Sequence, residues 1–237
     1  MDNNGEIDRF FAGLLRGEDA SWPSRWRGSQ IFDEIIGRVI FHGVAGLVLR
    51  RTPDIANWPS YVVNGIRSEA LSQTMWELRH HSVLGSLIEN LAHCGIASVV
   101  MKGTALAYAR YDEPALRRRS DTDLLVQKAD LRATRLVLKD LGFRNSEHTR
   151  TIFGNMYYQE SWHLAHVDGT NHEIDLHWEV TNSRALSAVL NAAECLSKAV
   201  PLPRLSKSAR STDSVTQLIQ CSLNRAIHGK TGYYSNS

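Results

Sequence analysis

The chain has 237 residues, of which 43% are hydrophobic and 22% are charged, so it can bury the core of one large domain or two small ones. Its 27 Lys and Arg residues nearly balance 25 Asp and Glu residues, and the net charge of +2 excludes the basic excess of a general nucleic-acid binder. Three widely spaced cysteines without a CxxC pair indicate neither a disulfide framework nor a zinc site. This composition is typical of a globular protein in a reducing cytoplasm.

Two segments bear on export and membranes. The N-terminal segment MDNNGEIDRF carries acidic residues where a secretory signal carries positive charge, so we expect a protein that is not exported. The most apolar run, VIFHGVAGLVL (residues 39–49), is too short to span a bilayer and is flanked by Arg38 and Arg50. We interpret this run as a buried helix, and we expect a cytoplasmic protein with no membrane partner.

Residues 1–94 are predicted to form a helical region. Leu84, Leu87, Ile88 and Leu91 recur at helical spacing, and Gly95 supplies a stop signal. The pattern then changes. IASVVM (96–101) predicts a buried strand, KGTALAYARY (102–111) a turn into a helix, and SDTDLLV (120–126) a second strand.

The second half of the chain mixes strands and helices. A helix is predicted over 128–141, and a hairpin or meander over 143–167 with interruptions at Gly154 and Asn155. EIDLHWEV (173–180) alternates polar with apolar residues and predicts a strand. A helix over 184–198, a loop or linker over 201–214 and a last helix over 214–227 complete the chain. We therefore predict an α+β fold: a helical region (1–94), a core on a small mixed sheet (95–200), and a linker, helix and tail (201–237).

The paired acids of SDTDLLV form the first candidate site. Asp121 and Asp123 point to the same side of their strand because side chains alternate with period two. Alternate acids are common on solvated strands, but the apolar LLV that follows places this pair beside the core. Asp175, on the polar side of the strand 173–180, is the best third acid. Three converging carboxylates favour Mg²⁺ or Mn²⁺, held in pairs about 3.5–4 Å apart for phosphoryl or nucleotidyl displacement.

The stretch VVMKGTAL contains the second candidate site. Gly103 followed by Thr104, between a strand and a helix, allows the backbone amides to approach a phosphate, although Thr104 can equally be a helix cap. Lys102 can neutralise phosphate charge. The run Arg117, Arg118, Arg119 can do the same, and we expect one of these three arginines to be functional.

The stretch VVMKGTALAYARYDEPALRRRSDTDLLV and the later EIDLHWEV together resemble the bacterial uncharacterised nucleotidyltransferase family, within the polymerase-beta-like nucleotidyltransferase superfamily. The resemblance covers roughly residues 80–200. Lys102 and Gly103 match the family's KG turn, and Arg117 matches an arginine four residues before the first acid. The remaining matches are to the paired acids and the last strand: Asp121, Asp123, Asp175, His177 and Trp178. The sequence departs from the pattern at Arg118, where the family usually has Pro.

The resemblance implies a nucleotidyltransferase core and an activity. Mg²⁺ (or Mn²⁺) held by Asp121, Asp123 and Asp175 would bridge the phosphates of an NTP, and Asp175 would position or deprotonate an acceptor hydroxyl. Lys102, Gly103, Thr104, Arg117 and His177 would bind the nucleotide; a structural, hydrogen-bonded role for His177 is equally open. The acceptor is unidentified and can be a small molecule, a protein or an RNA.

Two other functions stay open. The first is a catalytically inactive nucleotide-binding or partner-binding module of the same fold. The second is a metal-dependent phosphodiesterase, which we rank last because the ten histidines provide no HD or HxH pair that we can assign.

Overall fold

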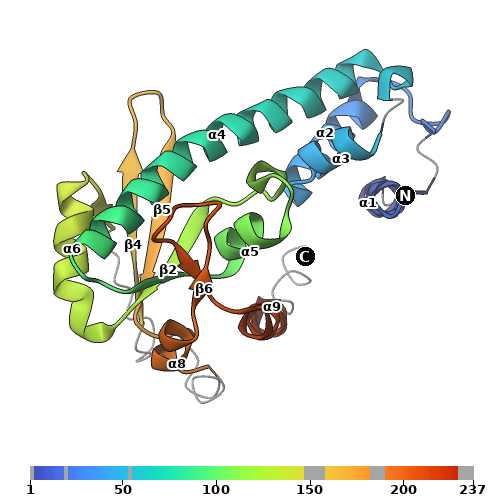
Figure 1. The fold of residues 1–237 in the computed structure, drawn as a ribbon. Helices are drawn as coiled ribbons and strands as arrows, with labels where there is room; N and C mark the ends of the chain where they lie inside the picture. The colour runs from blue at the N-terminus through green and yellow to red at the C-terminus, as the bar shows by residue number, and fades with distance from the viewer. Residues whose placement is uncertain (1–2, 19–20, 53–54, 147–157, 182–189, 229–237) are drawn as a thin grey trace, which may run out of the picture. The chain divides into compact units, whose positions relative to one another are not determined.

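The computed structural model describes residues 3–18, 21–52, 55–146, 158–181 and 190–228 (Figure 1). The chain forms two compact units. The first comprises Met1–Arg79 and Asp112–Arg118, and the second comprises His80–Tyr111 and Arg119–Ser237. Within the described ranges, no helix combines the length and apolarity that a membrane span needs. The predicted three-part division of the chain stays a prediction.

The first unit is helical, as predicted. Its elements are α1 (Asn3–Arg16), α2 (Ser29–His42), α3 (Ala45–Arg51), the 3-10 turn η1 (Ile55–Asn57), the first part of α4 (Ser60–His93) and the 3-10 turn η2 (Pro114–Leu116). Amphipathic spacing turns one side of each helix toward a shared apolar core. Fully buried members of this core include Ile7, Ile35, Val48 and Ile66.

The prediction of one buried helix over 39–49 is wrong. α2 ends at His42, and Gly43 adopts a left-handed conformation with φ of 64° before α3 begins at Ala45. The Gly43 N–H donates to the Ile40 carbonyl, which is how glycine commonly closes a helix. Phe41 is 72% exposed, so the apolar run is divided between core and surface.

The second unit is built on a seven-stranded mixed sheet of order β3-β4-β5-β2-β1-β7-β6. The strands are β1 (Ser98–Val100), β2 (Asp121–Val126), β3 (Arg144–Asn145), β4 (Gln159–Ala165), β5 (Asn171–His177), β6 (Val200–Pro201) and β7 (Arg210–Ser211). β2 is antiparallel to β1 and parallel to β5. β4 and β5 form an antiparallel hairpin. The α+β fold with a mixed sheet is therefore confirmed.

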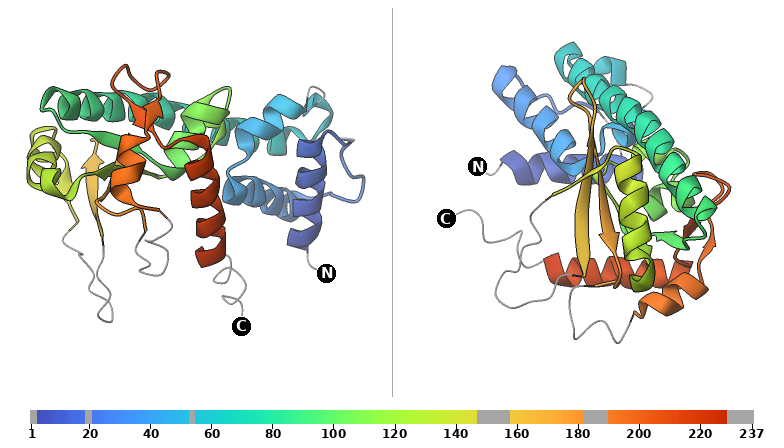
Figure 2. Two further views of the ribbon diagram at one scale, coloured as in Figure 1. Left: turned by 60° about the horizontal axis from the view of Figure 1, so that its bottom comes forward. Right: turned by 90° about the vertical axis from the view of Figure 1, so that its left-hand side faces the viewer.

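Helices lie on both sides of this sheet (Figure 2). On one side, the second part of α4 joins α5 (Lys102–Arg110) and α6 (Leu131–Asp140), which follows the 3-10 turn η3 (Lys128–Asp130). On the other side, α8 (Ala192–Ser197) and α9 (Ser214–His228) pack against β1 and β2. The largest core contains Leu87 of α4, Leu138 of α6, and Leu124 and Trp162 of the sheet.

Four predictions along the chain need correction or comment. The segment 201–214, predicted as a loop or linker, contains the last residue of β6 and all of β7. β7 is antiparallel to β6 and also pairs with the otherwise open edge of β1. β5 covers Asn171–His177 rather than 173–180. The predicted interruption at Gly154 and Asn155, and residues 184–189 of a predicted helix, lie outside the described residues.

Candidate active site

The two predicted acidic segments are neighbouring parallel strands. In the register of β2 and β5, Asp123 lies opposite Asp175, and Asp121 lies opposite Glu173. Register partners in a sheet point to the same side, so these carboxylates share one face. The opposite face carries apolar partners such as Leu124 and Leu176, which are fully buried. Burying one face of both strands thus forces the acids together on the other.

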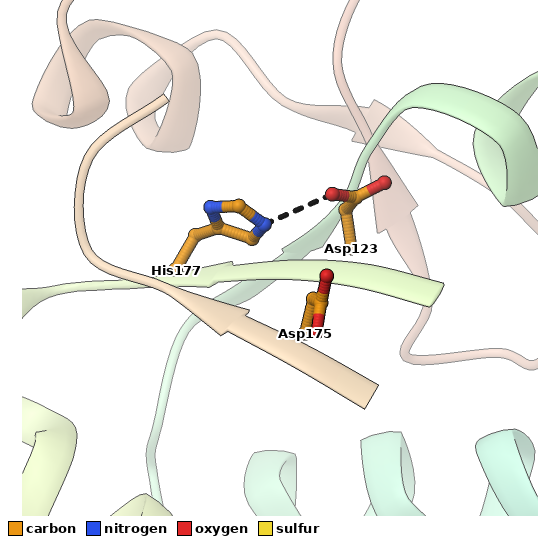
Figure 3. Close-up of side chains that lie close together, drawn as sticks. All are labelled: Asp123, Asp175 and His177. Atoms are coloured by element: carbon orange, nitrogen blue, oxygen red, sulfur yellow. Dashed lines mark hydrogen bonds and ion pairs between the residues drawn. The ribbon is translucent and has the colours of Figure 1, made fainter. Parts of the chain in front are cut away.

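Three side chains on this face are close enough to share one ion (Figure 3). Asp123, Asp175 and His177 each offer a ligand atom, and these atoms lie within 4.8 Å of one another. The His177 ring hydrogen-bonds through Nε2 to Asp123 Oδ1 at 2.9 Å. Asp123 and His177 are buried, and Asp175 is half-buried. Asp121 is not a member of this tight group.

Lys102 supplies a cation to the same carboxylate. Its Nζ lies 2.5 Å from Asp123 Oδ1. The Met101 N–H donates to the Asp123 carbonyl at 2.9 Å, which fixes the start of α5 beside β2. Lys102 has φ of 47° and is the one non-glycine with positive φ among the residues that the structure describes. Such a conformation costs about 1–3 kcal/mol and is typical of functional sites.

The two acids of β2 have opposite pKa shifts. Burial raises the pKa of Asp121, and repulsion from Asp123 and Asp175 raises it further. Burial also pushes the pKa of Asp123 upward, but the hydrogen bond from His177 and the charge of Lys102 outweigh it, and the net shift is downward. Asp123 is therefore the stably ionised member, whereas Asp121 gains most from an added cation.

Strand β4 provides contacts to Asp175 that the sequence motifs do not indicate. Ser161, the register partner of Asp175, donates from Oγ to Asp175 Oδ1 at 2.5 Å. Gln159 donates from Nε2 to Asp175 Oδ2 at 3.4 Å. The alternation of QESWHLA, with Gln159 and Ser161 on one side and Trp162 on the other, was a signal available in the sequence.

A buried polar network lies on the face of β2 opposite the acids. Thr122, which points away from the acids, hydrogen-bonds to Thr104 Oγ1 at 2.9 Å and to His80 Nε2 at 2.7 Å. Arg119 donates to Thr104 Oγ1 at 3.0 Å. His80 also contacts His172, with 3.2 Å between their Nδ1 atoms. The hydroxyl of Thr104 is thus directed to this network on the far side of β2.

The structure brings five predicted site residues to one place: Lys102, Asp121, Asp123, Asp175 and His177. Gly103 is the second residue of α5 and is half-buried. Arg117 belongs to the first unit, follows η2 and is half-buried. Arg118 hydrogen-bonds to the Ile40 carbonyl, within the same unit.

The chemistry of the donor set fits a divalent cation. The group offers two carboxylates and one imidazole nitrogen. Mg²⁺ prefers carboxylate oxygens, and Mn²⁺ accepts both the oxygens and the nitrogen. After burial, repulsion from Asp123 and Asp175 is the next cause of the raised pKa of Asp121, so this face carries a surplus of negative charge. A cation at the group of Asp123, Asp175 and His177 would relieve that surplus.

Comparison with known proteins agrees with this geometry. The model of the uncharacterised nucleotidyltransferase family matches residues 29–233, which include every described strand of the sheet. Searches of the curated proteins and of the solved structures found no match. Since the family match spans most of the sequence, the chain belongs to the uncharacterised nucleotidyltransferase family and is an enzyme of the nucleotidyltransferase class.

Proposed function

We propose that the protein is a Mg²⁺-dependent nucleotidyltransferase that moves a nucleoside monophosphate from an NTP to a hydroxyl acceptor and releases pyrophosphate. The observation that carries the proposal is the meeting of Asp123 and Asp175 as register partners, with His177 within 4.8 Å. The family match supports the reaction class.

Asp123 and Asp175 would hold the metal, and Asp121, on the same face of β2 but outside the three-residue group, would add a third carboxylate. Divalent cations bound there would supply charge to neutralise the NTP phosphates and the developing negative charge of the transfer. His177 would keep the Asp123 carboxylate oriented through the hydrogen bond to Oδ1. The buried network behind Thr122 would hold β2 in register, which keeps the acids at a fixed spacing.

Asp175 would bind the acceptor hydroxyl and accept its proton. Its position on the outer side of the group, next to β4, supports this role. Ser161 and Gln159 each hydrogen-bond to a different Asp175 oxygen, so the carboxylate is held in one orientation. A carboxylate that is oriented in advance loses less entropy when the acceptor binds.

The start of α5 would bind the triphosphate. The first turn of a helix directs main-chain N–H groups beyond the N-terminus, where phosphates bind. Gly103 and Thr104 would contribute such amides, and Lys102 would contribute its ammonium. Arg117 stays a predicted nucleotide-binding residue on its match to the family pattern. In this proposal His177 does not touch the nucleotide; it acts on the site through its hydrogen bond to Asp123.

The direct test is titration calorimetry with ATP, CTP, GTP and UTP in the presence of Mg²⁺. We expect one or more of the four to bind, and Asp123→Asn to abolish metal-dependent binding. Glu179→Gln is the matched control, because Glu179 lies beyond the end of β5 and outside the three-residue group. Failure of all four nucleotides to bind, or equal binding by Asp123→Asn, would refute the proposal.

The acceptor is found in a second experiment. Each NTP, labelled at the α-phosphate, is incubated with the protein and a cell extract, and label is sought on small molecules, proteins and RNA. Nucleotide binding without transfer of label to any fraction would instead support an inactive nucleotide-binding module.

A further inference from the structure

One oxygen of Asp123 carries two partners. Lys102 Nζ lies 2.5 Å away and His177 Nε2 lies 2.9 Å away, both from Oδ1. The Asp123 side chain is 9% exposed and that of Lys102 is 25% exposed, so this ion pair is shielded from water. Its strength therefore exceeds that of a surface ion pair.

The Lys102 ammonium acts on more than one acid of the site. Its partner Asp123 lies opposite Asp175 in the register of β2 and β5, so the ammonium is close to both carboxylates. A divalent cation held by Asp123 and Asp175 would lie close to this ammonium. Because like charges repel strongly where water is partly excluded, the two cations compete for the same carboxylates.

The backbone of Lys102 is held in place, but its side chain can reach either Asp123 or a phosphate at the N-terminus of α5. The bond from the Met101 N–H to the Asp123 carbonyl holds the chain at this point. Lys102 is also the first residue of α5, beside the amides of the helix N-terminus. A lysine is a point charge on a flexible stem, so it can leave a carboxylate for a phosphate without backbone movement.

We propose that Lys102 couples cation binding to nucleotide binding at this site. In the free protein its ammonium neutralises Asp123. When a divalent cation enters, Lys102 leaves Asp123 and pairs with a phosphate of the NTP. The inference rests on the proposed function and adds cooperative binding to it. The cation or the nucleotide alone binds weakly, and each raises the affinity for the other.

This coupling has a thermodynamic signature. If a nucleotide raises the affinity for the cation by some factor, the cation must raise the affinity for the nucleotide by the same factor. Lys102 contributes to the coupling because it competes with the cation for Asp123, so removing its charge should tighten the binding of the cation alone. The same change should weaken the binding of the nucleotide. A variant that only disrupted the site would weaken the binding of both ligands, so it would not produce these opposite effects.

The test measures Mn²⁺ binding to the full chain by electron paramagnetic resonance, with and without an α,β-methylene NTP analogue, and corrects for the Mn²⁺–analogue complex in solution. Calorimetry with the analogue alone, in EDTA, completes the cycle. We expect Lys102→Gln to bind Mn²⁺ alone on the order of tenfold more tightly than wild type, and to show weaker coupling between Mn²⁺ and the analogue.

Two further variants make the test specific. Lys102→Gly removes the ammonium and also tolerates φ of 47°, so it should share the gain in Mn²⁺ affinity while unfolding at a higher temperature than Lys102→Gln. Lys128→Gln removes an exposed lysine just after β2 and should behave as wild type.

The outcomes separate the two proposals. Equal or weaker Mn²⁺ binding by both Lys102 variants overturns the role of Lys102 in the coupling and leaves the nucleotidyltransferase proposal standing. Absence of both Mn²⁺ and analogue binding in wild type overturns both.

Discussion

Asp123 and Asp175 are register partners on parallel strands, although β3 and β4 come between them in the chain. Their separation is therefore set by the hydrogen bonding of the sheet and not by a loop. Sites built on strands keep their geometry better than sites built on loops. Substitution of either carboxylate should change the chemistry of the site with little change in fold.

The first prediction concerns Asp175. Asp175→Asn keeps the shape of the side chain and removes its charge, so a ligand for the metal and the group that accepts a proton are both lost. We expect the rate of nucleotidyl transfer to fall on the order of a thousandfold or more, measured as pyrophosphate release with the acceptor identified by labelling. Thermal unfolding should stay close to wild type, and Glu179→Gln should keep its rate. A fall in rate of less than about tenfold would remove Asp175 from the catalytic group.

Sequence alternation was sufficient to predict which side each acid occupies. Period-two spacing put Asp121 and Asp123 on one side of a strand, and Asp175 and His177 on one side of another. It could not determine that these strands are adjacent, because β-strand pairing depends on the whole topology. The sequence predicted that Asp123 and Asp175 are close only on the condition that their strands are neighbours. The structure shows that β2 and β5 are paired.

Contacts made by other elements could not be read from the motifs. Ser161 reaches Asp175 from β4, and His80 reaches Thr122 from α4, across long stretches of sequence. Neither residue type is distinctive by itself. The run 39–49 failed for a different reason: hydrophobicity alone predicted a continuous helix, whereas Gly43 interrupts it with a left-handed residue.

The second prediction compares two leucines of α6. Leu138 is fully buried in the core that joins α6 to the sheet, whereas Leu136 is 56% exposed on the same helix. Leu138→Ala should lower the free energy of unfolding by about 2–5 kcal/mol, because it leaves a cavity. Leu136→Ala, the same chemical change, should alter it by about 0.5 kcal/mol or less. Urea denaturation measures both. Equal losses would show that α6 does not pack as described.

The third prediction compares two glycines of the α2 region. Gly43 has a left-handed backbone with φ of 64°, which an alanine rarely adopts. An alanine Cβ there would also lie 2.7 Å from the Arg118 Cβ. Gly43→Ala should therefore destabilise the protein by about 1–2 kcal/mol or more. Gly37 lies within α2, and a Cβ there meets nothing within 4 Å, so Gly37→Ala should stabilise by about 0.5–1 kcal/mol. Opposite shifts in melting temperature are the expected result, and a shift of the same sign for both would contradict it.

The last prediction concerns pH and the buried His80. Burial lowers the pKa of His80 well below its ordinary value of 6.5, and the charge of Arg119 lowers it further. Below pH 6.5 the unfolded chain therefore binds a proton that the folded protein does not, and stability falls as pH drops, by up to about 1.4 kcal/mol per pH unit. Between pH 7.5 and 5.5 wild type should lose about 1 kcal/mol more than His80→Gln, measured by urea denaturation at each pH. His93→Gln, which changes an exposed histidine of the same helix, should keep the wild-type pH dependence. If His80→Gln and wild type lose equal stability on acidification, His80 is not held neutral in the folded protein.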